Sequence, residues 1–203
     1  MLMQACSMKK TDTKLKTYRT RRDFKTSPEP VGKKKIKKVN KKPIFVIHKH
    51  QASHLHYDLR LEIDGLLVSW AVPKGPSTNP AVKRLAVPTD DHPMEYAKFE
   101  GVIPEGNYGA GAVMLWDYGT YRNIKEKDGK AVSMAQCLKT GRIEVWLSGK
   151  KLKGGFALIK TKMGWLFFKM NDEHADKKRN VIKEDTSARS GKTMKEIVAL
   201  KRQ

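Results

Sequence analysis

Cysteine is scarce in this sequence, and long apolar runs are absent from it. Cys6 and Cys137 are the only cysteines and no CxxC spacing occurs, which argues against a disulfide framework and a cysteine-rich zinc site. No apolar run approaches the length of a membrane span, and the short apolar stretch in residues 1–7 is too short for a signal peptide. We therefore expect an intracellular, cytoplasmic protein with no membrane partner.

Acidic side chains are also few, since 21 Asp and Glu stand against 42 Lys and Arg, for a formal net charge of +21. Residues 1–43 hold 15 basic and 3 acidic side chains, so more than half of the excess lies in this N-terminal part. Binding of such a segment to a polyphosphate releases counterions, which favours nucleic acid as the partner. The alternative is a lysine-rich solvated tail that serves solubility.

The length of 203 residues fits one domain with extensions. We predict a basic, partly disordered arm over residues 1–43, a folded domain over 44–171 and a polar tail over 172–203. Residues 1–18 and 32–42 have too little apolar content to pack. The intervening residues 18–30 combine aromatic residues, prolines and paired charges, which suits an extended segment docked on a surface.

The clearest secondary-structure signal is strict alternation in HLHYDLRLEIDG, residues 54–65. Apolar side chains occupy the odd positions from 55 to 63, and polar ones occupy the even positions from 56 to 64, as in a strand with two different faces. Asp64 and Gly65 then form a tight turn, and LLVSWAV follows as the hairpin partner.

Further strand patterns follow along the chain, with glycines or short polar runs between most of them. These segments read RLAVP, AVMLWDYGTY, GRIEVWLSG, GGFALIKTK and WLFFKM. No internal repeat and no long helical period appears, except that residues 190–202 are expected to form a short helix. Short strands without intervening helices predict an all-β, mainly antiparallel barrel or sandwich.

The strongest local motif for chemistry is His50, His56 and Asp58. Period-2 geometry places His56 and Asp58 on one strand face, and His50 ends the preceding apolar run. Two imidazoles and a carboxylate suit Mn²⁺, Zn²⁺ or Fe²⁺ and leave positions open for water and substrate. The alternative is a chance cluster of surface histidines.

Two further side chains suit phosphate chemistry. Arg60 shares the face of Asp58, where a guanidinium could grip phosphate oxygens bidentately, or could simply pair with Glu62 or Asp64. His92 precedes a proline and is therefore held in extended backbone. It could donate to a phosphate oxygen or protonate a leaving group, or it could be an ordinary hydrogen-bonded loop histidine.

Two other conspicuous patterns favour structural roles. The glycines of GNYGAG, residues 106–111, lack the lysine of a nucleotide-binding loop and open a strand, so turn and bulge geometry explains them better. The four tryptophans all lie in predicted strands, which favours core packing over base stacking.

A set of longer motifs resembles the 3′-phosphoesterase domain of bacterial and archaeal DNA ligase D. The motifs are RRDFKTSPEP, FVIHKHQASHLHYDLRLEIDGLLVSWAVPKGPS, KRLAV, DHPMEYAKFEGVIPEGNYGAG, WDYGTY and WLFFKMNDEHAD. Together they cover about residues 18–175 and are highly specific. No polymerase or ligase module is present, so the chain is identified as a stand-alone member of this family.

The resemblance implies a compact β-barrel and a Mn²⁺-dependent site, with Zn²⁺ or Co²⁺ as other possible metals. It implies removal of a 3′-terminal ribonucleoside followed by hydrolysis of the remaining 3′-phosphate to a 3′-hydroxyl. The implied partners are DNA or DNA–RNA 3′ ends, with a separate DNA ligase and polymerase in non-homologous end joining.

The resemblance also assigns roles to residues at matching motif positions. The metal ligands are His50, His56 and Asp58. Catalytic, phosphate-contacting positions correspond to Arg60, His92 and Tyr96. Residues that engage the phosphate or nucleotide correspond to Lys74 and Arg84, and arm residues that complete the site for the diesterase step correspond to Arg22, Asp23 and Glu29.

One position departs from the family pattern. His48 stands where the family usually has glutamine, two residues before the first histidine ligand. The imidazole either replaces the hydrogen bond of the amide or adds a metal ligand. This position bears on the balance between diesterase and monoesterase activity.

Two other functions remain open from the residues. A non-catalytic nucleic-acid-binding barrel explains the charge and the tryptophans, but it does not explain why His, Asp and Arg line one strand face. A phosphoesterase for small molecules explains that face but leaves the basic arm without a role.

Overall fold

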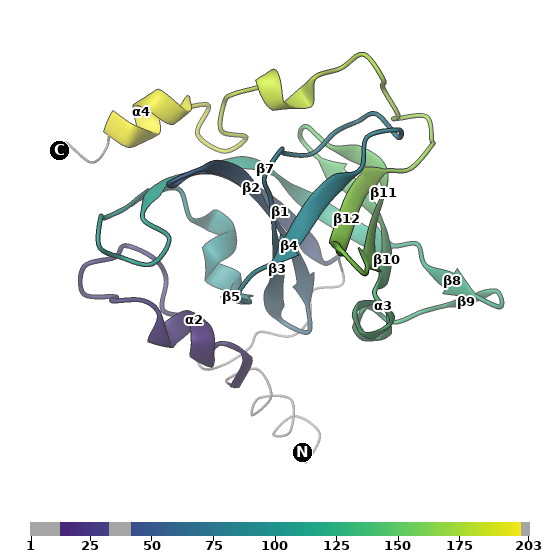
Figure 1. The fold of residues 1–203 in the computed structure, drawn as a ribbon, viewed down its shortest axis with the longest axis horizontal. Helices are drawn as coiled ribbons and strands as arrows, with labels where there is room; N and C mark the ends of the chain where they lie inside the picture. Colours follow the sequence, from purple (N-terminus) through teal and green to yellow (C-terminus); the bar gives the residue numbers. More distant parts are fainter. Residues whose placement is uncertain (1–12, 33–41, 200–203) are drawn as a thin grey trace.

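The computed structural model describes residues 13–32 and 42–199 of the chain. Within them, eight antiparallel strands close into a barrel, because the last strand of the ring pairs with the first (Figure 1). In spatial order the ring is β1 (Ile44–Gln51), β2 (Leu55–Ile63), β3 (Leu66–Val72), β4 (Arg84–Pro88), β12 (Gly164–Lys169), β11 (Lys153–Thr161), β10 (Arg142–Gly149) and β7 (Gly111–Asn123). The predicted antiparallel all-β class is confirmed, and the choice between barrel and sandwich is resolved.

Four short strands lie outside the ring. β5 (His92–Pro93) pairs with β3, and β6 (Gly101–Ile103) pairs with β7. The other two, β8 (Glu126–Lys127) and β9 (Lys130–Ala131), form a small hairpin that projects from the barrel (Figure 1).

The predicted hairpin between β2 and β3 is confirmed. Ile63 pairs with Leu66, so only Asp64 and Gly65 connect the two strands. Both have positive φ, 53° for Asp64 and 78° for Gly65, which is the conformation of a type I′ turn. This turn fixes the register of β2, and with it the face on which each side chain of β2 lies.

The barrel interior is an apolar core. The odd residues of β2 from Tyr57 to Ile63 point into it and are buried, as the alternation predicts. Trp70, Trp116 and Trp165 also pack there, as expected. Trp146 differs, because it is only partly buried on the outer surface, where the guanidinium of Arg122 lies 5.0 Å from its ring centroid.

A second apolar cluster covers the outer face of β1, β3 and β7. Leu15 and Tyr18 reach it from helix α2 (Lys16–Thr20) and the turn before it, and Tyr96 reaches it from the 3-10 helix η1 (Met94–Lys98). The prediction that residues 1–18 are disordered is therefore wrong for residues 13–18, and residues 18–30 form a helix end and turns instead of an extended segment. Leu15 and Tyr18 supply the apolar contacts that a count of charges overlooks. Residues 1–12 and 33–41 lie outside the described residues.

The C-terminal segment crosses one end of the barrel (Figure 1). The predicted terminal helix is confirmed as α4 (Met194–Ala199). The other helical elements of the described residues were not predicted: α2, η1, α3 (Met134–Thr140) and η2 (Val181–Lys183). Val181, Met194 and Ile197 are buried against the barrel core, so this polar segment is docked by a few apolar anchors. No helix of the described residues is long and apolar enough to cross a membrane.

Candidate active site

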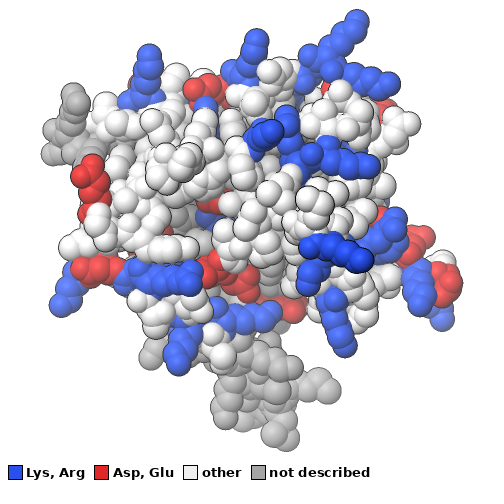
Figure 2. Space-filling model, in the orientation of Figure 1, with Lys and Arg blue, Asp and Glu red and all other residues white. Residues whose placement is uncertain are grey.

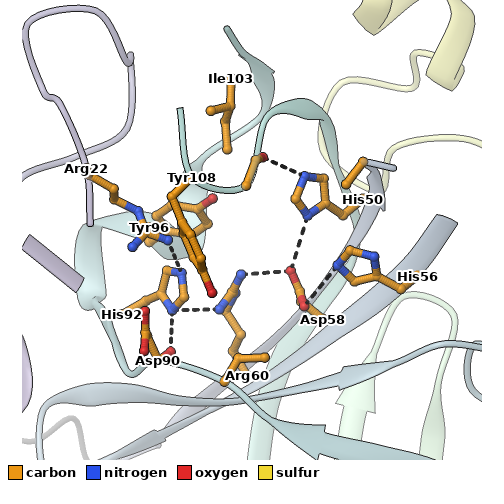
Figure 3. A pocket seen from close by; sticks show the side chains of 13 residues that line it. Arg22, His50, His56, Asp58, Arg60, Asp90, His92, Tyr96, Ile103 and Tyr108 are labelled. Atoms are coloured by element: carbon orange, nitrogen blue, oxygen red, sulfur yellow. Dashed lines mark hydrogen bonds and ion pairs between the residues drawn. The ribbon is translucent and has the colours of Figure 1, made fainter. Parts of the chain in front are cut away.

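The candidate site is a pocket on the outside of the barrel, over β1, β2 and β3. The even residues of β2 and β1 point into this outer space, which is closed by η1, the loop between β6 and β7, and residues of the arm (Figure 3). The cavity measures about 270 Å³. Its lining residues are Arg22, His50, Ala52, His56, Asp58, Arg60, Thr89, Asp90, His92, Tyr96, Ile103, Tyr108 and Gly109.

His50, His56 and Asp58 meet at one side of this pocket. His50 pairs with His56 across β1 and β2, so the two imidazoles stand side by side. Nδ1 of His50 lies 3.8 Å from Oδ2 of Asp58, and Nε2 of His56 lies 3.6 Å from Oδ1. The three ligand atoms lie within 4.8 Å of one another, so the predicted metal triad is brought together.

Backbone carbonyls fix the orientation of both imidazoles. Nε2 of His50 donates to the Gly109 carbonyl at 3.0 Å, and Nδ1 of His56 donates to the His54 carbonyl at 2.9 Å. A carbonyl can only accept, so the proton of each ring is on the nitrogen that faces it. The other nitrogen of each ring then presents its lone pair toward Asp58, as in metal sites whose histidines are oriented by second hydrogen bonds. This donor set fits a divalent transition metal.

The electrostatics favour the ligand form of His50. Burial lowers the pKa of His50 below its usual value; the Asp58 carboxylate opposes this effect, while the neighbouring His56 ring and the Arg60 cation add to it. A neutral imidazole is the form that binds a metal. His50 is therefore ready to coordinate at neutral pH.

Arg60 is buried and connects the triad to the rest of the pocket. Its Nη2 donates to Oδ2 of Asp58 at 3.0 Å, and its Nη1 donates to the Ser69 hydroxyl at 2.8 Å. Nη1 also lies 2.8 Å from Nδ1 of His92. The sequence left open a pair with Glu62 or Asp64, and the structure shows Asp58 as the carboxylate partner instead.

His92 faces Arg60 from β5. Its Nδ1 donates to the Asp90 carbonyl at 2.7 Å, which leaves the lone pair on Nε2, and Nη2 of Arg22 lies 3.2 Å from Nε2. Burial lowers the pKa of His92 well below its usual value, and the cations of Arg60 and Arg22 lower it further. His92 is therefore neutral in the unliganded pocket and accepts a hydrogen bond from the arm.

Tyr96 and His48 pack around the Arg60 guanidinium. The Tyr96 ring centroid lies 4.9 Å from the guanidinium carbon, and burial raises the pKa of Tyr96 well above its usual value, so its hydroxyl stays protonated. Nε of Arg60 donates to Nδ1 of His48 at 3.3 Å. His48 lies opposite Asp58 in the pairing of β1 with β2, but it neither lines the pocket nor belongs to the group of three possible ligands. Its contact with Arg60 agrees with the role of hydrogen-bond partner, which stays a prediction.

Among the described residues of the arm, one side chain lines the pocket directly. Arg22 lines it, and Nε of Arg22 donates to Oε1 of the buried Glu29 at 2.8 Å. The Tyr18 ring stacks beneath the same guanidinium at 3.9 Å. Asp23 is exposed, and its carboxylate accepts from the Lys25 amide within a turn. The structure thus brings Arg22 and Glu29 to the site, but Asp23 lies outside the pocket lining.

Lys74 and Arg84 do not line the pocket either. Lys74 is exposed in the turn after β3, and Arg84 begins β4 on the neighbouring part of the barrel. Sequence reasoning missed Asp90, Tyr108 and Gly109, which do line it. Asp90 lies beside the DHP motif and the other two lie in the glycine loop, so closer attention to these motifs could have found them.

Comparison with known proteins identifies the family to which the sequence is similar. Residues 48–160 match the family model described as the DNA Ligase D 3′-phosphoesterase domain. The chain is 45% identical over 167 residues to the multifunctional non-homologous end joining protein LigD of Pseudomonas aeruginosa, which covers 79% of the chain and 19% of that protein. It is 48% identical over 161 residues to the protein of the same name from Mycolicibacterium smegmatis, with 79% and 21% covered.

A third relative is the multifunctional non-homologous end joining DNA repair protein LigD of Mycobacterium tuberculosis. The identity is 43% over 171 residues, covering 81% of the chain and 21% of the relative. The chain thus spans about a fifth of the length of the curated relatives that it matches.

Proposed function

Because the chain belongs to the DNA ligase D 3′-phosphoesterase domain family, we propose that it is a metal-dependent phosphoesterase that processes the 3′ ends of DNA and DNA–RNA strands. Family membership supports hydrolysis of phosphoester bonds in non-homologous end joining. The finer proposal is removal of a 3′-ribonucleoside, followed by removal of the 3′-phosphate. The single observation that carries it is the oriented triad of His50, His56 and Asp58 beside the buried Arg60.

We propose Mn²⁺ as the metal held by the triad. When bound, such a metal supplies Lewis-acid charge and lowers the pKa of the water that it coordinates toward ~7. Zn²⁺ and Co²⁺ suit the same ligand set. The remaining work of the site falls to the side chains around it.

We propose that Arg60 and Arg22 bind the phosphoester. Each has a guanidinium at the pocket wall. Arg22 and His92 lie on the side opposite His50 and His56, and Arg60 lies between His92 and Asp58 (Figure 3). Negative charge that develops on phosphoryl oxygens during hydrolysis is stabilised by such fixed hydrogen-bond donors. The Asp58 carboxylate pairs with Arg60 and the Glu29 carboxylate pairs with Arg22, so both guanidinium groups are held at the pocket.

Tyr96 and His92 are the two candidates for steadying the departing oxygen. The protonated hydroxyl of Tyr96 is a donor over the whole neutral range, because its pKa is raised. Neutral His92 receives a proton only when the dianionic substrate offsets the nearby guanidinium charges. We propose that both bind substrate oxygens, with Tyr96 as the constant donor.

The basic charge supports a nucleic-acid substrate. Lys and Arg side chains cover more of the face shown in Figure 2 than Asp and Glu do. We propose that the arm, residues 1–43, binds the phosphate backbone, while residues 18–30 complete the pocket. Neutralising the six lysines between residues 33 and 41 should make oligonucleotide binding less salt-dependent. The slope of the logarithm of the binding constant against the logarithm of salt concentration should become shallower by about 0.7 for each phosphate of a single strand that the arm no longer neutralises.

The decisive measurement is phosphate release from an oligonucleotide with a 3′-phosphate, with added Mn²⁺ and with EDTA. We expect turnover with Mn²⁺ and none with EDTA. Hydrolysis that is indifferent to EDTA would contradict the metal proposal. Salt-sensitive binding of the oligonucleotide without any turnover would favour the non-catalytic nucleic-acid-binding barrel. The small-molecule enzyme would be favoured if the protein hydrolysed p-nitrophenyl phosphate but no oligonucleotide, and if neutralising the lysines left that hydrolysis unchanged.

A further inference from the structure

The pocket has two tyrosine rings in its lining, and they differ in exposure. Tyr96 is 2% exposed and has its ring enclosed by protein, whereas Tyr108 is 49% exposed. In the view of Figure 3 the Tyr108 ring crosses the pocket between the histidines of the metal triad and the side formed by Arg22 and His92. A half-exposed ring at this position is available to a bound ligand.

Two arginines of the arm lie close to the Tyr108 ring. The guanidinium carbon of Arg21 lies 5.1 Å from the ring centroid, and that of Arg22 lies 5.4 Å from it. Nη1 of Arg21 also donates to the Tyr108 hydroxyl at 3.3 Å and to the Asp90 carboxylate at 3.2 Å. Cations near the face of an aromatic ring stabilise its placement and attract phosphate groups to it.

The loop that contains Tyr108 is fixed relative to the triad. Gly106 and Gly109, on either side of Tyr108, have φ of 84° and 78°, a conformation that favours glycine. The Gly109 carbonyl accepts the hydrogen bond from His50 at 3.0 Å. On the arm side, the Thr26 hydroxyl donates to the side-chain carbonyl of Asn107 at 3.2 Å. The ring therefore stands at a set distance from the place where a phosphoester would meet the metal.

The size of the pocket limits what can enter it. Its volume of about 270 Å³ is below the roughly 300–1,000 Å³ of cavities that enclose whole drug-sized ligands. The terminal phosphoester and its sugar would fill such a space, and the base would remain at the rim. An exposed aromatic ring beside basic side chains is the arrangement that proteins use to stack bases of single strands without sequence preference.

We propose that Tyr108 is a specificity-determining residue whose ring stacks on the base of the nucleotide that bears the 3′-terminal phosphoester. This inference rests on the proposed function. Stacking is tolerant of base identity, since every base has a flat face. The ring therefore selects nucleotide ends over phosphate esters that lack a base, and it does so equally for all four bases.

The test compares two oligonucleotides that differ only at the 3′-phosphorylated nucleotide, which has either a thymine base or no base. For Tyr108→Ala we expect kcat/KM on the thymine end to fall about five- to 150-fold, the range that loss of one stacked base gives. On the abasic end the same variant should match the wild type. Equal losses on both substrates would overturn the proposal, because they would indicate a general disturbance of the site through Gly109 and His50.

Two variants separate the ring from its surroundings. Tyr108→Phe keeps the ring and loses only the bond from Arg21, so it should retain the preference for the thymine end. Loss of that preference in Tyr108→Phe would overturn the stacking role. Tyr118→Ala is the matched control, since Tyr118 is 36% exposed on β7 and does not line the pocket. It should behave as the wild type on both ends.

A binding measurement keeps this proposal distinct from the proposed function. An oligonucleotide with 2-aminopurine at its 3′-phosphorylated nucleotide is titrated with protein in EDTA, and fluorescence quenching reports stacking. We expect quenching by the wild type and little by Tyr108→Ala. Quenching that depends on Tyr108, with no hydrolysis in Mn²⁺, would sink the proposed function and support stacking. Hydrolysis in Mn²⁺ together with equal quenching by wild type and Tyr108→Ala would support the proposed function and overturn the stacking role of Tyr108.

Discussion

Nη2 of Arg60 lies 3.0 Å from Oδ2 of Asp58, so the carboxylate of the metal triad is already paired with a buried cation. This pair explains how a carboxylate and a guanidinium can both be buried in the wall of the pocket. A buried charge is costly unless it is paired and hydrogen-bonded. The same interaction also ties the metal triad to His92, because Nη1 of Arg60 lies beside that ring. A substitution of Asp58 should therefore alter the surroundings of His92, and a substitution of His92 should alter those of Asp58.

Loss of a triad ligand should abolish metal binding while the barrel stays folded. Mutation of a residue that only orients a metal ligand typically lowers metal affinity about 10–100-fold. Asp58→Asn removes a ligand itself, so we expect its Mn²⁺ affinity to fall by at least that much, and its rate of phosphate release to fall as well. Isothermal titration with Mn²⁺ and phosphate release measure the two effects. His174→Ala is the matched control, because His174 is an exposed histidine that lies near Glu173. Wild-type Mn²⁺ affinity in Asp58→Asn would refute the triad.

Replacement of Arg60 by lysine should separate charge from geometry. Lysine keeps the positive charge but cannot reach Asp58, Ser69 and a phosphate oxygen at once, since it lacks the planar fork of the guanidinium. We expect kcat to fall about 10²–10³-fold, the usual cost of removing one donor to developing negative charge. Steady-state phosphate release measures it, with Arg142→Lys on the exposed side of β10 as the control. Unchanged kcat in Arg60→Lys would show that charge suffices.

The arm should matter more for ribonucleoside removal than for phosphate removal. Arg22 lines the pocket and is held by Glu29, so Arg22→Lys and Glu29→Gln are expected to slow the first step more than the second. Asp23→Asn should have the smaller effect, because Asp23 faces a turn outside the pocket. Denaturing gels that resolve both products of one ribonucleotide-ended strand give the two rates. Equal losses in both steps would contradict this division of labour.

The buried His92 should make the protein less stable in mild acid. Burial and the cations of Arg60 and Arg22 hold the pKa of His92 below its unfolded value, while the Asp90 carbonyl opposes them and His48 adds to them. Below pH ~6.5 the unfolded chain therefore binds a proton that the folded chain does not. The free energy of unfolding then falls as pH decreases, by at most about 1.4 kcal/mol per pH unit for this one group.

His92→Gln removes that proton-linked contribution. The difference in unfolding free energy between wild type and His92→Gln should be larger at pH 7 than at pH 5, because only the wild type loses the His92 contribution on acidification. Urea denaturation in EDTA at the two pH values measures both proteins. A difference that stays constant with pH would show that His92 does not titrate as its surroundings indicate.

The sequence predicted the barrel well because its strands have two unlike faces. Alternation along β2 predicted both the buried odd residues and the shared face of His56, Asp58 and Arg60, and the Asp64–Gly65 turn predicted the hairpin. These are local signals, readable within a few residues. The closure of the ring, in which β7 returns to β1, depends on pairing between distant segments and has no local signature.

Local patterns did not predict how the rest of the site is assembled, for the same reason, although the family resemblance supplied Arg22 and Tyr96 as site residues. The position of Arg22 depends on the docking of Leu15 and Tyr18, two apolar residues in a stretch that looked too charged to pack. The exposed ring of Tyr108 enters the pocket because arginines from the distant arm hold it. Family resemblance supplied Lys74 and Arg84, which lie outside the pocket lining, and their roles stay predictions.

The two-residue turn at Asp64 and Gly65 links correct folding to activity. On β2 the odd side chains make the core and the even ones make the pocket, so a slip of one residue would exchange the two sets. Asp58 and Arg60 would then enter an apolar interior, and the buried leucines would face the polar pocket. Such a mispaired chain could be neither stable nor partly active. Specific activity should therefore report the fraction of molecules in the native register, which makes enzymatic assay a direct measure of refolding yield.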